Sequence, residues 1–113
     1  MTDFTYETVY PIDRERLLRD LASSDPKAVA NALYAACRSE EDTKWLEDEC
    51  VKRLKAADLE VRWAAATCLG DLAFFRRPLD ARRVATALEA AIHDSTISDP
   101  ASFSLRMVRE FLI

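Results

Sequence analysis

The stretch DLEVRWAAATCLGDLA, residues 58–73, decides the fold of this chain. It is mostly apolar and contains Gly70, the only glycine of the sequence. On a helical wheel its core residues fall on one face, namely Val61, Ala65, Cys68, Leu69 and Leu72. Small alanines extend that face sideways, so that a neighbouring helix can approach closely on each flank. The spacing therefore predicts a helix over 59–75 that lies in the middle of a row of three.

The rest of the chain also has the pattern of helices. A single glycine leaves almost none for the tight turns of a β protein. Asp25-Pro26 and Asp99-Pro100 each place an N-cap acid before a proline at the first helical position. Apolar residues then recur at intervals of three and four. We therefore expect an all-α fold of six helices, the other five covering 13–22, 26–38, 42–56, 79–93 and the segment from Pro100 to the C-terminus.

These helices belong to a repeat. A shift of 33 residues superposes apolar positions and turn acids of two units, placing Leu17 on Cys50, Leu21 on Leu54 and Asp25 on Asp58. Periods of this length are typical of helical solenoids, whose units bury their apolar faces by stacking on one another. The unit is a helix, a turn that ends in Asp and a second helix. Residues 1–113 are therefore predicted to form one domain, a short α-solenoid of three helical pairs with residues 1–11 as an extended N-terminal arm.

Composition argues against several classes of function. The net charge of −4 disfavours a nucleic-acid binder, which needs a basic face to neutralise phosphates. No apolar run approaches the ~20 residues that a membrane span requires. Cys37, Cys50 and Cys68 occupy apolar helix positions and form no CxxC pair. We expect them to be reduced core thiols in a cytoplasmic protein.

The sequence also lacks the motifs of common catalytic sites. His93 is the only histidine, so a zinc site is not expected. One glycine excludes the G-x-G-x-x-G and Walker-type phosphate loops, and nothing resembles a nucleophile elbow. We therefore expect no enzyme activity, no bound metal and no cofactor.

The pattern D-x-x-V-R-x-x-A-A-x-x-L-G-x-L-A at residues 58–73 resembles the second helix of a HEAT or armadillo-type repeat. The likeness is partial in the first unit and poor in the third. It implies that the second helices of the three units line one shared face. It also implies that Arg62 pairs with a turn aspartate, Asp58 or Asp25, and serves as a structural brace.

One arc of the 59–75 helix, away from its core face, carries polar and aromatic side chains. Together with a tyrosine of the preceding second helix, they form the predicted partner-binding set: Tyr34, Glu60, Trp63, Thr67, Asp71 and Phe74. Tyrosine and tryptophan are enriched at binding hot spots, which favours this interpretation. The alternative is that Trp63 and Phe74 only cover the edge of the core.

The acidic run EEDTKWLEDE, residues 40–49, is a second candidate surface. Glu41, Asp42, Glu47 and Asp48 would form a patch that attracts a basic partner. The alternative is a solvated helix face, whose first acids favour the helix dipole.

A basic cluster follows further along the chain, comprising Arg76, Arg77, Arg82 and Arg83. These arginines could bind phosphate groups, but we expect them to form ion pairs with nearby acids instead.

The sequence as a whole predicts a non-catalytic protein-binding module. A small, acidic binder of this kind is similar in character to bacterial toxin-immunity proteins, including those of contact-dependent growth inhibition. That likeness implies a toxin partner with a basic surface, such as a nuclease, and a cytoplasmic protein that is monomeric when free. The alternatives are a HEAT-like adaptor or regulatory protein in a complex, and a nucleic-acid-handling module of the same fold.

Overall fold

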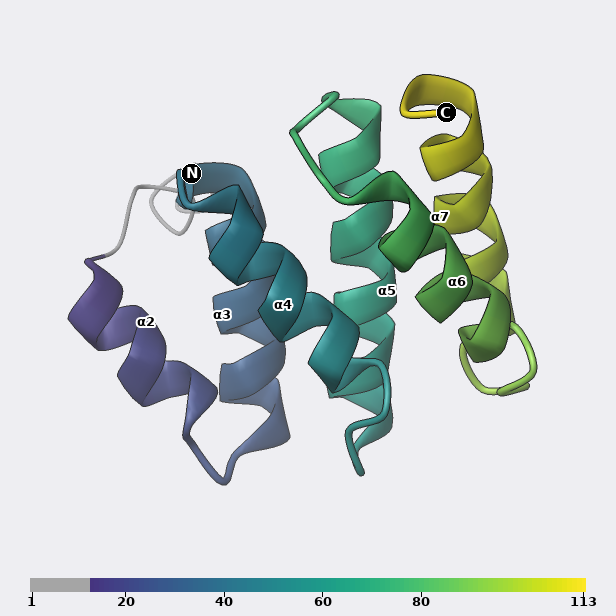
Figure 1. Ribbon diagram of the computed structural model, residues 1–113. Helices are drawn as coiled ribbons and strands as arrows, with labels where there is room; N and C mark the ends of the chain where they lie inside the picture. The colour runs from purple at the N-terminus through teal and green to yellow at the C-terminus, as the bar shows by residue number, and fades with distance from the viewer. Residues whose placement is uncertain (1–12) are drawn as a thin grey trace, which may run out of the picture.

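The computed structural model describes residues 13–113, and this part of the chain contains six α-helices (Figure 1). They are α2 (Arg14–Leu21), α3 (Pro26–Ser39), α4 (Thr43–Arg53), α5 (Leu59–Phe74), α6 (Ala81–Ala91) and α7 (Ser98–Phe111). The prediction of an all-α fold is confirmed, and each helix end lies within three residues of its predicted position. The predicted N-terminal arm lies outside the described residues. No helix within residues 13–113 has both the length and the apolar character needed to cross a bilayer.

Aspartate N-caps explain where five of the six helices begin. In each case an aspartate precedes the helix, and its carboxylate accepts a backbone N–H of the first turn: Asp13, Asp25, Asp42, Asp58 and Asp80. This contact satisfies one of the amide groups that the first turn leaves unpaired. The prediction that Asp99 caps the last helix is wrong, because α7 begins at Ser98 without a side-chain cap. Pro100 instead lies inside the first turn, where its missing N–H costs no helical hydrogen bond.

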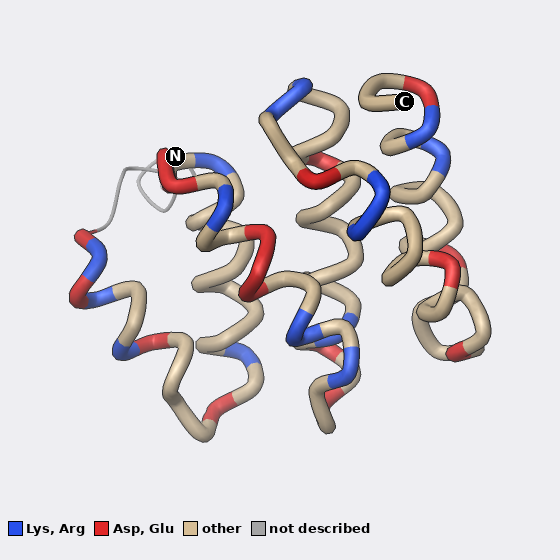
Figure 2. The backbone as a smooth tube through the Cα atoms, in the orientation of Figure 1, with Lys and Arg blue, Asp and Glu red and all other residues tan. Residues whose placement is uncertain are grey.

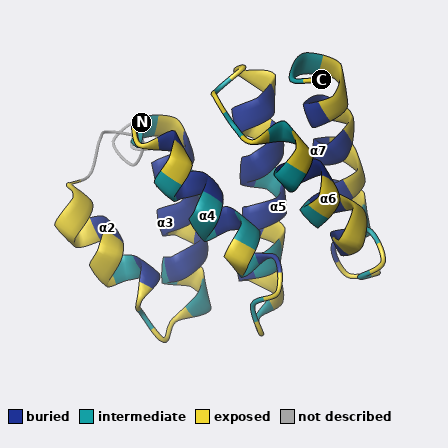
Figure 3. Ribbon diagram, viewed as in Figure 1, coloured by how far each residue is buried: buried dark blue, intermediate teal, exposed yellow. Residues whose placement is uncertain are grey.

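The helices form three consecutive pairs, and the second helix of each pair lies beside the second helix of the next (Figure 1). α5 packs against α3 on one flank and against α7 on the other, so it is the middle helix of the predicted row. Figure 3 shows buried residues along α3, α5 and α7 where these helices face one another. Because 9 of the 16 residues of α5 are buried, this helix is the centre of the hydrophobic core.

Close contact between α5 and α7 explains the single glycine. A Cβ atom added to Gly70 would lie 2.2 Å from the Ser104 Oγ and 2.9 Å from the Ser104 Cα. The buried Ser104 hydroxyl donates a 2.6 Å hydrogen bond to the carbonyl oxygen of Ala66, one turn before Gly70. The methyl side chain of Ala66 and the absence of a side chain at Gly70 therefore let the two helices approach until this bond can form.

Arg62 braces the second and third units, as the HEAT resemblance implied, but with a different partner. Its guanidinium donates to the carbonyl oxygens of Ala56 and Ala57, both at 2.9 Å. It also forms an ion pair with Asp94, at 3.1 Å between Nε and the carboxylate. The predicted pairing with Asp58 or Asp25 is wrong, because the carboxylate of Asp58 instead caps α5 and that of Asp25 caps α3.

The cysteines occupy the core positions predicted for them. All three are buried free thiols, and the Cys37 thiol lies 3.5 Å from the carbonyl oxygen of Cys68. Burial raises the pKa of the Cys68 thiol well above its ordinary value. A thiol of this kind stays protonated and unreactive at neutral pH, which agrees with a packing role.

Candidate protein-binding face

An exposed stripe runs along α5 on the side that faces away from its buried residues. Spacings of three and four residues place five side chains on it: Glu60, Trp63, Thr67, Asp71 and Phe74. Trp63 is 41% exposed and Phe74 is 50% exposed, which is unusual for large aromatic side chains in the central helix of a core. The structure thus places five of the six predicted binding residues on one accessible surface.

Tyr34 of α3, the sixth predicted residue, joins this stripe from the neighbouring helix. Burial raises the pKa of the Tyr34 hydroxyl, the Thr67 side chain opposes the rise, and the nearby charges of Asp71 and Glu60 add to it. Helix α3 packs directly against α5, and these influences agree with a position of Tyr34 beside the α5 stripe. The six residues, Tyr34 included, are called the α5 face below.

The acids of the α5 face have no ion-pair partner in the described part of the chain. Partial burial raises the pKa of Asp71, and the charge of Arg38 opposes this only in part. A partly desolvated carboxylate that forms no ion pair gains more from a new positive partner than a fully hydrated one does. The α5 face can therefore accept a basic group from outside the chain.

The structure adds an aromatic cluster that the sequence interpretation missed. Phe74 makes edge-to-face contacts with Phe75 and Phe111, with ring centroids 5.2 and 5.5 Å apart. Phe75 is 70% exposed, and Phe111 comes from the end of α7. The adjacent Phe74 and Phe75 in the sequence were a signal for this cluster. No feature of the sequence around Phe111 indicated that its ring would contact Phe74.

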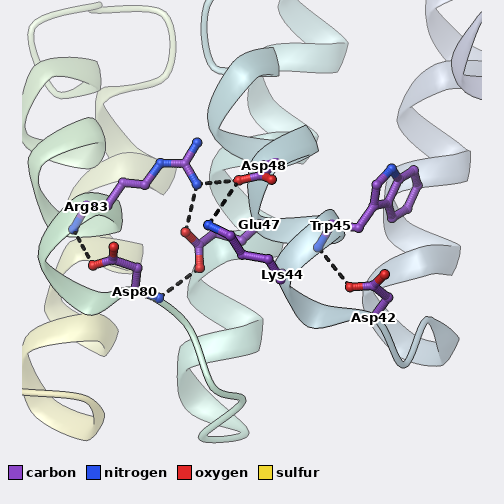
Figure 4. A network of polar contacts seen from close by, with 7 residues as sticks. All are labelled: Asp42, Lys44, Trp45, Glu47, Asp48, Asp80 and Arg83. Carbon is purple, nitrogen blue, oxygen red and sulfur yellow. Dashed lines mark hydrogen bonds and ion pairs between the residues drawn. The ribbon is translucent and has the colours of Figure 1, made fainter.

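Most acids of the run at residues 40–49 form ion pairs or hydrogen bonds with other residues of this chain, and Figure 4 shows those of Asp42, Glu47 and Asp48. Glu47 is only 1% exposed, so its predicted place on an accessible acidic patch is wrong. Its carboxylate accepts 2.8 Å hydrogen bonds from the backbone N–H of Asp80 and from the guanidinium of Arg83. Arg83 also donates to Asp48, and this hydrogen bond lowers the pKa of that carboxyl.

Other acids of the run are paired as well. Glu40 accepts a 2.8 Å hydrogen bond from Arg14, and this contact lowers the pKa of Glu40. Asp42 caps α4 and lies 3.5 Å from the same arginine, while Glu49 pairs with Arg53. Figure 2 shows basic residues beside the acidic ones of α4. Of the four residues predicted for this patch, Glu41 is the one that is exposed and has no ion pair within residues 13–113.

The basic cluster also serves the fold in part. Arg83 pairs with Glu47 and Asp48, as predicted for this group of arginines. Arg77 donates to the hydroxyl of Thr43 and to the carbonyl oxygen of Glu40, tying the end of α5 to the start of α4. These two arginines are therefore committed to internal contacts.

A further surface feature is a groove of about 750 Å³ between α4 and α6. Its lining combines apolar residues with basic ones, including Val51, Leu54, Ala87, Lys52 and Lys55. The groove lies between the first helices of the second and third helical pairs. None of the six residues of the α5 face lines it, so the two surfaces are separate.

Replacing Glu47 with alanine is expected to lower the free energy of unfolding by about 2–3 kcal/mol. The substitution leaves the N–H of Asp80 without its acceptor and removes one carboxylate from Arg83, which is partly exposed and can rehydrate. Chemical denaturation measures the change. Glu41→Ala, in the same acidic run, is the control and is expected to change stability by less than about 0.5 kcal/mol. Equal losses for the two variants would contradict the buried role of Glu47.

Comparison with known proteins gives a match in structure but none in sequence. The sequence matches no protein-family model, and it matches no curated protein. In structure, the chain is similar to a chain in the crystal structure of a CDI complex from Cupriavidus taiwanensis, with a TM-score of 0.82 and 25% sequence identity. The similarity covers 92% of this chain and 94% of that chain, so nearly the whole of each takes part in the shared fold.

Proposed function

We propose that this chain is an immunity protein that binds a cognate bacterial toxin of a contact-dependent growth inhibition system and neutralises it. The observation that carries the proposal is the similarity to a chain of a CDI complex over almost the full length of both proteins. The α5 face supports it independently, because exposed aromatic residues beside acids that form no ion pair within residues 13–113 are suited to binding a protein.

The chemistry of the α5 face defines the partner surface. Trp63 and Phe74 supply apolar anchors, and burying large aromatic side chains provides much of the energy of a typical interface. Glu60 and Asp71 flank these anchors and would meet basic groups of the partner. A nuclease toxin has such a surface where it binds the phosphates of its substrate. An immunity protein bound there would block the active site.

Toxin challenge tests this proposal. On this proposal the cognate toxin is encoded next to this chain's gene, and its toxin domain is expressed from an inducible promoter, with or without this chain. We expect growth arrest without the chain and normal growth with it. An inactivated form of the same domain is expected to co-purify with the chain at a one-to-one ratio. Growth arrest that persists in the presence of folded chain, with no co-purification, would refute the proposed function.

A further inference from the structure

Helix α5 ends in a strained turn that is built around Arg76. The N–H of Arg77 donates to the carbonyl oxygen of Leu72, and the N–H of Arg76 donates to that of Ala73, both at 2.9 Å. These two bonds define a Schellman motif, in which the residue in the left-handed conformation is usually glycine. Here that residue is Arg76, whose φ is 56°. No other non-glycine residue in the described part of the chain has a positive φ. The fold therefore holds an arginine where glycine would be less strained.

The strained backbone directs the Arg76 side chain onto the aromatic cluster. Its guanidinium carbon lies 4.7 Å from the centroid of the Phe111 ring. The turn after α5 and the C-terminus thus meet at one end of the molecule, as Figure 1 shows. Stacking on an aromatic ring holds the guanidinium plane fixed and leaves its N–H edge free to donate.

Arg76 differs from the arginines that stabilise the fold. Arg77, Arg83 and Arg62 all donate to oxygen atoms of other segments. Arg76 makes no ion pair and no side-chain hydrogen bond to any residue in the range 13–113. Among residues 13–113 it is therefore an oriented cation without an acceptor, and it follows the exposed Phe75 in the sequence.

We propose that Arg76 binds a carboxylate on the protein partner, while Phe74, Phe75 and Phe111 make the apolar contact around that ion pair. This inference rests on the proposed function and extends the α5 face to the end of the helix. A planar guanidinium fork matches a carboxylate with two parallel hydrogen bonds, and the flanking phenylalanines exclude water from them. The partner surface then has basic groups opposite Glu60 and Asp71, and one acidic group opposite Arg76. Charges of both signs at fixed positions allow a single docking orientation.

The same combination of arginine and aromatic residues also occurs where proteins bind single-stranded nucleic acid. The geometry favours a protein here. A base stacks on an open ring face, but one face of Phe111 is covered by Arg76, and Phe74 is engaged by rings on two sides. Phe75 is therefore the one ring of the cluster that is left open, whereas successive bases need several such rings. Asp71, one turn before this cluster, would also repel a phosphate backbone.

Arg76→Gly separates recognition from stability. We expect the variant to melt at or above the temperature of the wild type, because glycine relieves the left-handed strain. Its affinity for the inactivated toxin domain is expected to fall about 10- to 100-fold, the range for loss of an interface hot spot. Arg76→Lys keeps the charge without the planar fork and is expected to lie between the two. The control is Arg82→Ala, another exposed arginine, which is expected to bind like the wild type.

The outcomes distinguish this inference from the proposed function. If the wild type binds the toxin domain and Arg76→Gly binds it equally well, the role of Arg76 is refuted and the immunity function stands. If the wild type does not bind the toxin domain, both are refuted. If the wild type binds a short single-stranded RNA and Arg76→Gly loses that binding, the cluster is a nucleic-acid site and the carboxylate proposal is wrong.

Discussion

Combining Trp63→Ala with Asp71→Lys is expected to weaken binding to the proposed toxin at least about 100-fold and to abolish protection of growth. The first change removes an aromatic anchor that is 41% exposed in the free chain. The second places a cation where the partner is expected to present one, so attraction becomes repulsion. Each change alone is expected to have a smaller effect than the pair. Calorimetric titration with the inactivated toxin domain measures all three variants.

The matched control for this double variant is Glu41→Lys. It reverses one exposed charge, as Asp71→Lys does, but in the acidic run, where the other acids pair with residues of this chain. We expect it to bind and protect like the wild type. All of these substitutions lie at exposed positions, so melting temperatures close to that of the wild type would show that the fold is intact. Loss of binding by Glu41→Lys, with full binding by the double variant, would transfer the interface to residues 40–49.

Gly70→Ala is expected to lower the free energy of unfolding by about 3 kcal/mol or more. The new methyl group would lie within 3 Å of three atoms of Ser104, one of them in the backbone. Rotation of a side chain cannot relieve a backbone clash, so α5 and α7 have to separate. Separation also breaks the hydrogen bond from the Ser104 hydroxyl to the carbonyl oxygen of Ala66. Chemical denaturation, compared with the wild type, measures the loss.

Thr67→Ala, one turn earlier on the accessible side of α5, is the control for this prediction. We expect it to change stability by less than about 0.5 kcal/mol. Adding Ser104→Gly to Gly70→Ala removes two of the three close contacts, so the double variant is expected to recover part of the loss. A loss below about 1 kcal/mol for Gly70→Ala alone would contradict the close packing of α5 on α7.

Local features of the sequence were enough to predict the helices and the α5 face. Each aspartate cap acts on an amide two or three residues away, and each helix face follows from spacings of three and four. The α5 face was predictable for the same reason, because side chains one turn apart on a single helix share a side whatever packs around them. The position of Tyr34 next to these side chains was predictable from the 33-residue period, which relates its helix to α5.

Features that depend on distant residues were not predictable in this way. Glu47 looked like a surface acid until the fold placed it against Arg83, 36 positions later. Arg62 was expected to bind a turn aspartate, but the spacing alone could not select Asp94 among the candidates. The left-handed conformation of Arg76 also had no local signal, because such positions are normally recognised by a glycine.

Helix α5 has two roles, and a different side of the helix serves each of them. Its buried side, with Gly70 at the closest approach, fixes α3 and α7 on either flank. Its other side exposes Trp63 and Phe74 on a helix that is held in place by the core. A rigid support reduces the entropy lost when a partner binds, so the same packing that stabilises the fold also prepares the proposed interface.

Hydroxyl-radical footprinting with and without the inactivated toxin domain tests most directly whether the chain binds through the α5 face. The chain contains two tryptophans, and they report on different surfaces: Trp63 lies on the α5 face, and Trp45 lies on α4 beneath Arg14. Binding through the α5 face predicts that the toxin domain protects Trp63 and Phe74 from oxidation and leaves Trp45 unchanged. Protection of Trp45 or of the groove between α4 and α6, with Trp63 still fully oxidised, would contradict it.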